Sequence, residues 1–253
     1  MSADDAVIAA LAEQQAELAG LLVGLDDESW QRPSPCEGWT VADVVLHLAQ
    51  TNELAVASVH GNFVDGVARL AGDGPTSSVD DGAALMVARE RGRPGPVVRD
   101  RWQASADELH EVLAGSDPGR RVTWVAGELS VRTLASTRLA ETWIHTGDVA
   151  VALGVELAPS DRLWHVARLA WRTLPYAFGR AGRELAGQVA FALRAPSGAA
   201  WDFVPEGESV TVVRGDAVEL CLVAGRRVDP DDTGLGGDGP DAGAVLELVR
   251  TYA

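Results

Sequence analysis

The spacing of apolar residues changes along this 253-residue chain near Gly182. Before that point, apolar residues recur every three or four positions, which is the period of amphipathic helices. After it, short runs rich in β-forming residues alternate with Pro, Gly and Asp. We therefore predict an α+β protein with a helical bundle over residues 1–181 and a small α+β domain over residues 182–253.

Several helix boundaries can be predicted from capping residues. Thr40 and Asp43 have the spacing of a capping box, and the helix that they begin should continue to about His60. Ser130 and Gly154 are a suitable N-cap and C-terminal glycine for a second, longer helix. Other helices are expected over 5–25, 97–114, 160–179 and 241–251, loops over 72–82 and 92–96, and strands over 188–194, 200–204, 209–214 and 217–223.

The composition excludes several classes of function. The formal charge is −16, which argues against nucleic acid and anionic membranes as partners. All 21 basic residues are Arg, so neither a Schiff-base lysine nor a phosphate-binding Walker lysine is available. Because the N-terminus is acidic and no apolar run approaches the roughly 18 residues of a membrane span, we expect a cytoplasmic protein.

Glu141, His145 and His47 are candidate metal ligands. Glu141 and His145 stand four residues apart in a helical pattern, so both side chains point toward one side of the helix. His47 lies within an apolar pentad of another predicted helix. Two imidazoles and one carboxylate form the kind of three-residue site that leaves a position open on catalytic zinc. The alternatives are that His47 is a hydrogen-bonded core residue, and that Glu141 and His145 are one of the i, i+4 pairs of opposite potential charge found on many helices.

Asp148 follows His145 by three residues on the same predicted helix. It could orient the imidazole by accepting a hydrogen bond, or it could face solvent. The two cysteines, Cys36 and Cys221, imply no disulfide framework. Cys36 could be a nucleophile, but no motif-bearing histidine partner is recognisable beside it, and we interpret it as a loop or bundle-entry residue. Cys221 should be a small buried hydrophobe.

Two stretches of the sequence resemble the mycothiol-dependent maleylpyruvate isomerase family within the DinB-like metal-binding bundles. They are PSPCEGWTVADVVLHL at 33–48, preceded by Trp30, and ETWIHTGDVA at 141–150. The resemblance spans nearly the whole chain. It implies a four-helix bundle followed by a small domain akin to sterol carrier proteins, with His47, Glu141 and His145 as the zinc ligands.

The same resemblance points to substrate-binding residues. The segment 217–226 is similar to the family's apolar strand or helix that ends in Gly-Arg, which implies that Arg226 faces the active site. A guanidinium can bind a carboxylate through two parallel hydrogen bonds. Arg227 is the alternative one position later, and a solvated surface arginine is another. Trp143, which lies between two expected ligands, could wall the cofactor site.

The resemblance implies Zn²⁺, or another divalent ion, together with mycothiol as a thiol cosubstrate. The partner would be an electrophilic small molecule, acted on by an isomerase or an S-transferase. Two other classes remain open: a metal-dependent hydrolase with Asp148 as general base, or a noncatalytic protein that holds an apolar ligand. A thiol-independent enzyme acting on natural products is a further alternative, and we expect a monomer or homodimer.

Overall fold

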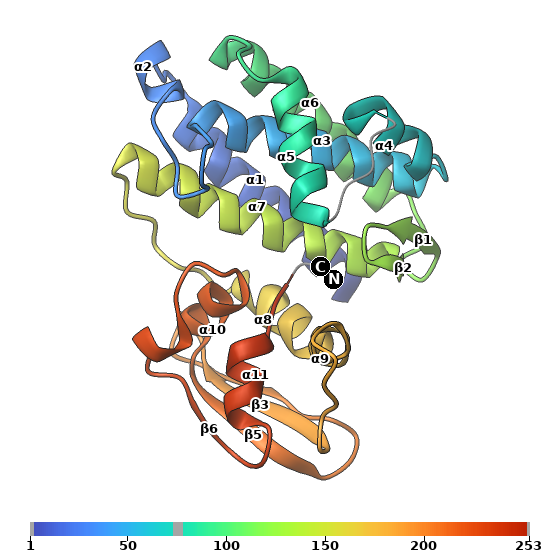
Figure 1. Ribbon diagram of the computed structural model, residues 1–253, viewed down its shortest axis with the longest axis vertical. Helices are drawn as coiled ribbons and strands as arrows, with labels where there is room; N and C mark the ends of the chain where they lie inside the picture. The colour runs from blue at the N-terminus through green and yellow to red at the C-terminus, as the bar shows by residue number, and fades with distance from the viewer. Residues whose placement is uncertain (1–2, 73–77, 252–253) are drawn as a thin grey trace. The chain divides into compact units, whose positions relative to one another are not determined.

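The computed structural model describes residues 3–72 and 78–251 and separates into two compact units, Met1–Leu157 and Ala158–Ala253 (Figure 1). We refer to them as the N-terminal and C-terminal units. The first is helical and the second contains a small sheet with helices, so the predicted α+β class is confirmed. Within the described residues, no helix has both the length and the apolar character that a membrane crossing requires.

Four long helices form the bundle of the N-terminal unit. Helix α3 packs against α6 and α7, and α1 packs against the same two helices. The long helices are α1 (Ala3–Leu22), α3 (Val41–Val59), α6 (Gly95–Ala114) and α7 (Val131–Leu153). The shorter elements are α2 (Asp27–Trp30), α4 (Phe63–Ala71), α5 (Val79–Glu90) and the antiparallel hairpin of β1 (Arg121–Trp124) and β2 (Gly127–Ser130).

The ends of α3 and α7 follow the predicted capping residues. The Thr40 side chain accepts from the Asp43 backbone N–H while the Asp43 carboxylate accepts from the Thr40 N–H, which completes a capping box. Ser130 caps the start of α7, and Gly154 ends it with a φ of 69°. Both predicted boundaries are confirmed, and these two helices carry the candidate metal ligands.

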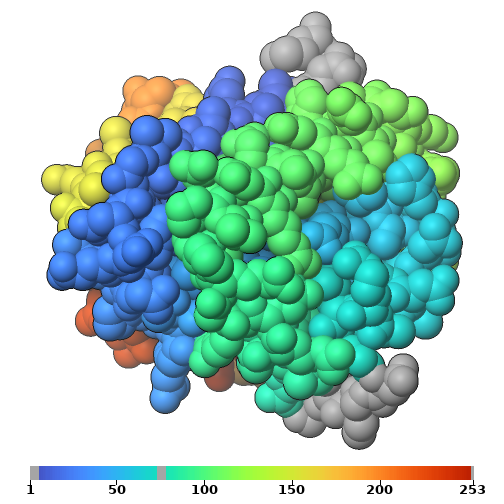
Figure 2. Space-filling model, turned by 90° about the horizontal axis from the view of Figure 1, so that it is seen from above, coloured from blue at the N-terminus to red at the C-terminus, as the bar shows by residue number. Residues whose placement is uncertain are grey.

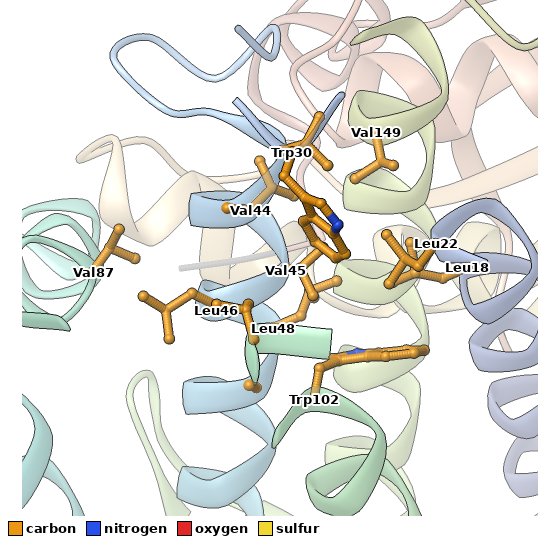
Figure 3. Close-up of a cluster of buried hydrophobic side chains, with 14 residues drawn as sticks. Leu18, Leu22, Trp30, Val44, Val45, Leu46, Leu48, Val87, Trp102 and Val149 are labelled. Carbon is orange, nitrogen blue, oxygen red and sulfur yellow. The ribbon is translucent and has the colours of Figure 1, made fainter. Parts of the chain in front are cut away.

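An apolar cluster holds these helices together. Figure 3 shows Trp30 and Trp102 among leucine and valine side chains of α1, α3 and α7. Val149 of α7 and Val45 of α3 are both completely buried in this cluster. Burying a side chain of this size stabilises a fold by about 1.5–3 kcal/mol, so the cluster fixes the spacing of α3 and α7.

The C-terminal unit is built on a four-stranded sheet of order β4-β3-β5-β6. Strands β3 and β5 are parallel, and each outer strand is antiparallel to its neighbour. The strands are β3 (Gln188–Arg194), β4 (Ala200–Phe203), β5 (Ser209–Asp216) and β6 (Gly236–Asp238). The helices are α8 (Leu163–Arg172), α9 (Leu174–Arg180), α10 (Ala217–Ala224) and α11 (Ala242–Leu248), with a 3₁₀ turn at Pro230–Asp232.

Some predicted elements differ from the structure. The strand expected over 217–223 is wrong, because this segment is helix α10, whose first turn is capped by the Asp216 carboxylate accepting from the Val218 N–H. The helix expected over 160–179 is divided into α8 and α9, and Pro175 in the first turn of α9 cannot donate a helical hydrogen bond. Of the predicted 72–82 loop, residues 73–77 lie outside the described residues and the part from Val79 belongs to α5.

The boundary between the two compact units lies earlier in the sequence than the change from helical to strand periodicity. The division falls after Leu157, whereas periodicity places the domain boundary between residues 181 and 182. The difference comes from α8 and α9, which have helical periodicity but pack with later elements. Helix α8 contacts α10 and β4, and α9 contacts α11.

Candidate metal centre

The structure brings His47 of α3 together with Glu141 and His145 of α7. The donor atoms of all three lie within 4.8 Å of one another. The Nε2 atoms of His47 and His145 are 3.5 Å and 3.7 Å from the same Glu141 oxygen, Oε2. Two tetrahedral ligands at zinc-like bond lengths are about 3.3 Å apart, so this spacing suits one shared ion. The structure therefore places the three predicted side chains together, and metal binding by them stays a prediction.

Burial differs among the three side chains. His47 and His145 are 6 % and 8 % exposed, while the Glu141 side chain keeps 20 % of its surface exposed. The two imidazole rings meet nearly edge to face, with centroids 4.9 Å apart. The site is therefore anchored by buried histidines and is reached from solvent on the side of the carboxylate.

Asp148 contacts the far side of the His145 ring. Its Oδ2 atom lies 2.8 Å from His145 Nδ1, and the residue is only 2 % exposed. This contact fixes the ring orientation and directs Nε2 toward Glu141, as carboxylates that support metal-binding histidines do. The solvent-facing alternative for Asp148 is therefore wrong. A direct catalytic role of Asp148 stays a prediction.

The Cys36 side chain also contacts Asp148 and His145. Its position in a loop, far away in the sequence, did not indicate this contact. Its Sγ atom donates to Asp148 Oδ2 at 3.2 Å and lies 3.8 Å from His145 Nδ1. The interpretation that Cys36 has no histidine beside it is wrong. Cys36, His145 and Asp148 form a second group whose donor atoms lie close enough to hold an ion. Cys221 is completely buried as predicted, and burial raises the pKa of its thiol.

The loop before α3 also brings an aromatic ring to the site. The Trp39 ring centroid is 5.1 Å from that of His47 and 6.5 Å from that of His145. Trp143 lies on α7 two residues from each expected ligand, and side chains two residues apart on a helix do not share a face. Sequence reasoning therefore missed Trp39 as the ring beside the imidazoles. A cofactor-binding role of Trp143 stays a prediction.

Burial and hydrogen bonding shift the pKa values of His47, Glu141 and His145 in different directions. Burial lowers the pKa of His47 to about 4, although the Glu141 carboxylate opposes that shift. Burial alone would raise the pKa of Glu141, but hydrogen bonds from His145 and His47 outweigh it and hold the pKa well below its usual range. Burial would likewise lower the pKa of His145, but hydrogen bonds with Asp148, Cys36 and Glu141 raise it well above 6.5. These shifts favour the proton on His145 over His47 or Glu141.

A buried arginine lies one turn before Glu141 on α7. Arg138 is 1 % exposed, and its Nη2 donates to Thr51 Oγ1 at 2.9 Å. The Thr51 hydroxyl donates in turn to the His47 carbonyl at 2.8 Å. The Arg138 guanidinium also lies 5.9 Å from the centroid of the Trp124 ring. Arg138 therefore links α7 to the backbone that carries His47.

The three donors fit a divalent ion by their chemistry. One carboxylate and two histidines, of which His47 is neutral near pH 7, are borderline ligands typical of zinc. Among the residues that the structure describes, none hydrogen-bonds to the buried Nδ1 of His47, and Nε2 is the ring atom that lies 3.5 Å from Glu141 Oε2. The donor set and its spacing therefore support a zinc-like ion.

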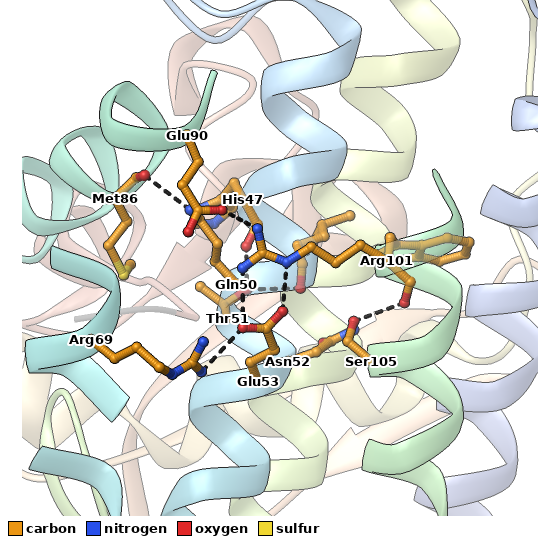
Figure 4. A network of polar contacts seen from close by, with 12 residues as sticks. His47, Gln50, Thr51, Asn52, Glu53, Arg69, Met86, Glu90, Arg101 and Ser105 are labelled. Atoms are coloured by element: carbon orange, nitrogen blue, oxygen red, sulfur yellow. Dashed lines mark hydrogen bonds and ion pairs between the residues drawn. The ribbon is translucent and has the colours of Figure 1, made fainter. Parts of the chain in front are cut away.

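A separate polar groove lies between α3–α4 and α5–α6. Figure 2 shows this hollow between the blue-to-cyan and green segments, and Figure 4 shows the ion pairs along it. Arg101 donates to both Glu53 oxygens, at 2.7 and 3.1 Å, and also pairs with Glu90. Arg69 donates to Glu53 at 3.2 Å. None of the three candidate metal ligands is among the residues that line this groove. The Arg69 and Arg101 guanidinium groups are paired with the Glu53 and Glu90 carboxylates.

Arg226 lies two residues after the last residue of α10 in the C-terminal unit. It is exposed, and its Nη1 donates to the Glu247 carbonyl at 3.0 Å. Its φ of 58° is in the left-handed region, which residues other than glycine seldom adopt. The neighbouring Arg227 donates to the Gly225 carbonyl at 2.9 Å. Binding of a substrate carboxylate by either arginine stays a prediction.

The fold and the donor cluster together define a helical-bundle protein with a candidate metal centre between two helices and a small α+β unit at its C-terminal end. Residues 11–150 match the model of the mycothiol maleylpyruvate isomerase N-terminal domain. The chain belongs to this family.

Comparisons with whole proteins extend beyond that domain. The Mycobacterium tuberculosis H37Rv protein "Uncharacterized protein Rv0036c" is 31 % identical over 249 residues, covering 97 % of this chain and 95 % of that one. The "Uncharacterized protein MT0041" of strain CDC 1551 matches equally. The crystal structure of the mycothiol-dependent maleylpyruvate isomerase has a TM-score of 0.64 at 17 % identity, covering 95 % of this chain and 96 % of that one. A mutant of that enzyme gives a TM-score of 0.63 at 16 % identity with the same coverage, and both matches show a common fold.

Proposed function

We propose that this protein is a zinc-dependent, thiol-using enzyme of the cytoplasm, either a mycothiol-dependent isomerase or an S-transferase. Its substrate would be an electrophilic small molecule. The observation that carries the proposal is the convergence of His47 and His145 on one Glu141 oxygen, in a chain that belongs to the mycothiol maleylpyruvate isomerase family.

His47, Glu141 and His145 would hold the ion through Nε2, Oε2 and Nε2. A zinc ion bound there would favour the thiolate form of a thiol at neutral pH and thereby supply a nucleophile. Two neutral imidazoles and one carboxylate cancel only one of its two charges, so an anionic partner is favoured at the open position.

The surrounding residues prepare the site for this chemistry. Asp148 holds the His145 ring in place, and Trp39 covers the imidazoles with an apolar surface. The exposed side of Glu141 is where a cosubstrate would approach, because both histidines are buried. Apart from these neighbours of the ion, Arg226 of the C-terminal unit is proposed, from the family resemblance, to bind a carboxylate of the substrate through its planar guanidinium.

A hydrolase is less well supported by the geometry. It would place water at the open position and use Asp148 as general base. However, Asp148 Oδ2 accepts one hydrogen bond from Cys36 and is engaged with Nδ1 of His145, on the ring side away from Glu141. This carboxylate is therefore occupied in orienting the histidine.

Metal analysis tests the site. The purified protein should retain about one equivalent of zinc after dialysis against a mild chelator, and a His145→Ala variant should lose it. His60→Ala is the matched control, since His60 is exposed and lines the separate groove. Equal metal content in the wild type and the His145→Ala variant would show that this site is wrong.

Turnover tests the reaction. The zinc-loaded protein would be incubated with a panel of electrophiles, with and without mycothiol, and the products identified by mass spectrometry. We expect isomerised product or a thiol adduct only when mycothiol is present. Thiol-independent hydrolysis or modification would support the other enzyme classes, and bound but unchanged apolar ligand would support a noncatalytic protein.

A further inference from the structure

We propose that Cys36 is a positioning residue of the metal centre: its thiol holds the Asp148 carboxylate, which in turn holds the His145 imidazole. This inference rests on the proposed metal function. It concerns how the chain supports one ligand, and it gives a role to a cysteine that sequence reasoning assigned to a loop.

The contacts form a short chain of hydrogen bonds. Cys36 S–H donates to Asp148 Oδ2 at 3.2 Å, and the same oxygen lies 2.8 Å from His145 Nδ1. A carboxylate oxygen has two lone pairs and can accept both donors. Sγ and Nδ1 are themselves 3.8 Å apart, and both lie within hydrogen-bonding distance of the same carboxylate oxygen. Since Asp148 is 2 % exposed, these donors take the place of water.

Backbone hydrogen bonds hold Cys36 in place before α3 begins. The Ser34 N–H donates to the Trp39 carbonyl at 2.9 Å, and the Trp39 N–H donates to the Cys36 carbonyl at 3.0 Å. Ser34 Oγ accepts from the Cys36 N–H at 3.2 Å. Gly38 completes the turn with a φ of +73°, which a side chain would strain. The thiol therefore ties a closed loop to helix α7.

The ring of His145 separates Cys36 from the proposed ion. Cys36 and Asp148 lie at Nδ1, whereas Glu141 lies 3.7 Å from Nε2. These two nitrogens point in different directions from the imidazole ring. An ion shared with His47 and Glu141 would therefore lie at Nε2, on the opposite side of the ring from Cys36. A sulfur at Nδ1 affects such an ion by fixing the imidazole.

Removal of the thiol should therefore weaken metal binding through Asp148. Partners that support metal ligands typically change affinity by about 10- to 100-fold when mutated, and Cys36 acts one contact further away. We expect Cys36→Ala to weaken Co²⁺ binding to the full-length protein by about 3- to 10-fold, the range of one net hydrogen bond. Cys36→Ser, which keeps an O–H donor, should restore most of the loss.

A double-mutant cycle tests whether the effect passes through Asp148. Co²⁺ affinity would be measured for wild type, Cys36→Ala, Asp148→Asn and the double variant, with the melting temperature of each as a check on folding. Cys36→Ala should have little further effect once Asp148 is replaced. Ser34→Ala is the matched control, because it loosens the same loop without touching Asp148, and its effect should be the same in both backgrounds.

The outcomes separate this inference from the proposed metal function. Absence of Co²⁺ binding to the wild type would overturn both. Normal binding that Cys36→Ala leaves unchanged, or weakens equally in both backgrounds, would overturn the positioning role alone. A sulfur-to-cobalt charge-transfer band that Cys36→Ser abolishes would show that Cys36 is itself a ligand of a second ion, together with His145 and Asp148. That result would also overturn the positioning role of Cys36.

Discussion

Metal binding at this site should release close to one proton per ion at pH 7. Metal and proton compete for Nε2 of His145, whose pKa is raised well above 6.5 by Asp148, Cys36 and Glu141. His47 contributes almost nothing, because burial holds its pKa at about 4. Glu141 is already ionised, since its pKa lies well below the usual range.

The expected number of released protons differs from that of a site whose histidines have ordinary pKa values. Two histidines titrating near 6.5 would each be about one quarter protonated at pH 7 and would together release about half a proton. The raised pKa of His145 also extends the pH dependence of the apparent metal affinity to higher pH. Apparent affinity should increase about tenfold per pH unit through neutrality and level off only above the pKa of His145 in the folded protein.

Calorimetric titration of the metal-free protein in buffers of different ionisation enthalpy would count the released protons. Asp148→Asn should lower the count at pH 7, because it removes a carboxylate that favours protonated His145. His60→Gln, altered in the separate groove, should leave the count unchanged. A release near half a proton, or an affinity that is already constant with pH at pH 7, would refute this account of the site's charges.

Other predictions concern stability and substrate binding. Thr40→Ala should lower the free energy of unfolding in urea by about 0.5–2 kcal/mol, because it breaks the capping box of α3, and unchanged stability would contradict that role. Gly95→Ala should cost about 1–3 kcal/mol in the same assay, since its Cβ would lie 2.2 Å from Cγ of the buried Trp30. Its control, Gly20→Ala on an exposed and open helix face, should stabilise by up to about 1 kcal/mol, and similar losses in both would argue against the clash. Arg226→Lys should retain metal and melting temperature while turnover of a carboxylate-bearing substrate falls about 10- to 100-fold, and unchanged kinetics would remove Arg226 from the reaction.

The candidate ligands could be predicted because local rules govern their positions. Glu141 and His145 share a helix face through their four-residue spacing, and Thr40 with Asp43 sets the start of the helix that carries His47. The packing of those helices against each other could not be derived from spacing alone. The family resemblance supplied that link.

The missed features depend on contacts that sequence patterns do not record. Cys36 and His145 are 109 positions apart, and only the closed loop and the α3–α7 packing bring them together. Trp143 is near the ligands in sequence but two residues from each on a helix, whereas the loop residue Trp39 meets both rings. Helix α10 was expected as a strand because a short apolar run has no periodicity that separates the two.

The placement of donors on both α3 and α7 has a consequence for the lifetime of the folded state. Thr51 and Arg138, which also join these helices, are 87 positions apart, so a bound ion would close a long loop of the chain. Opening the bundle would then require either release of the ion or rupture of its bonds to one helix. We expect metal loading to slow unfolding far more than it accelerates folding, since the donors meet only after the helices have packed. Resistance to proteolysis would then depend on the metal supply as well as on the hydrophobic core.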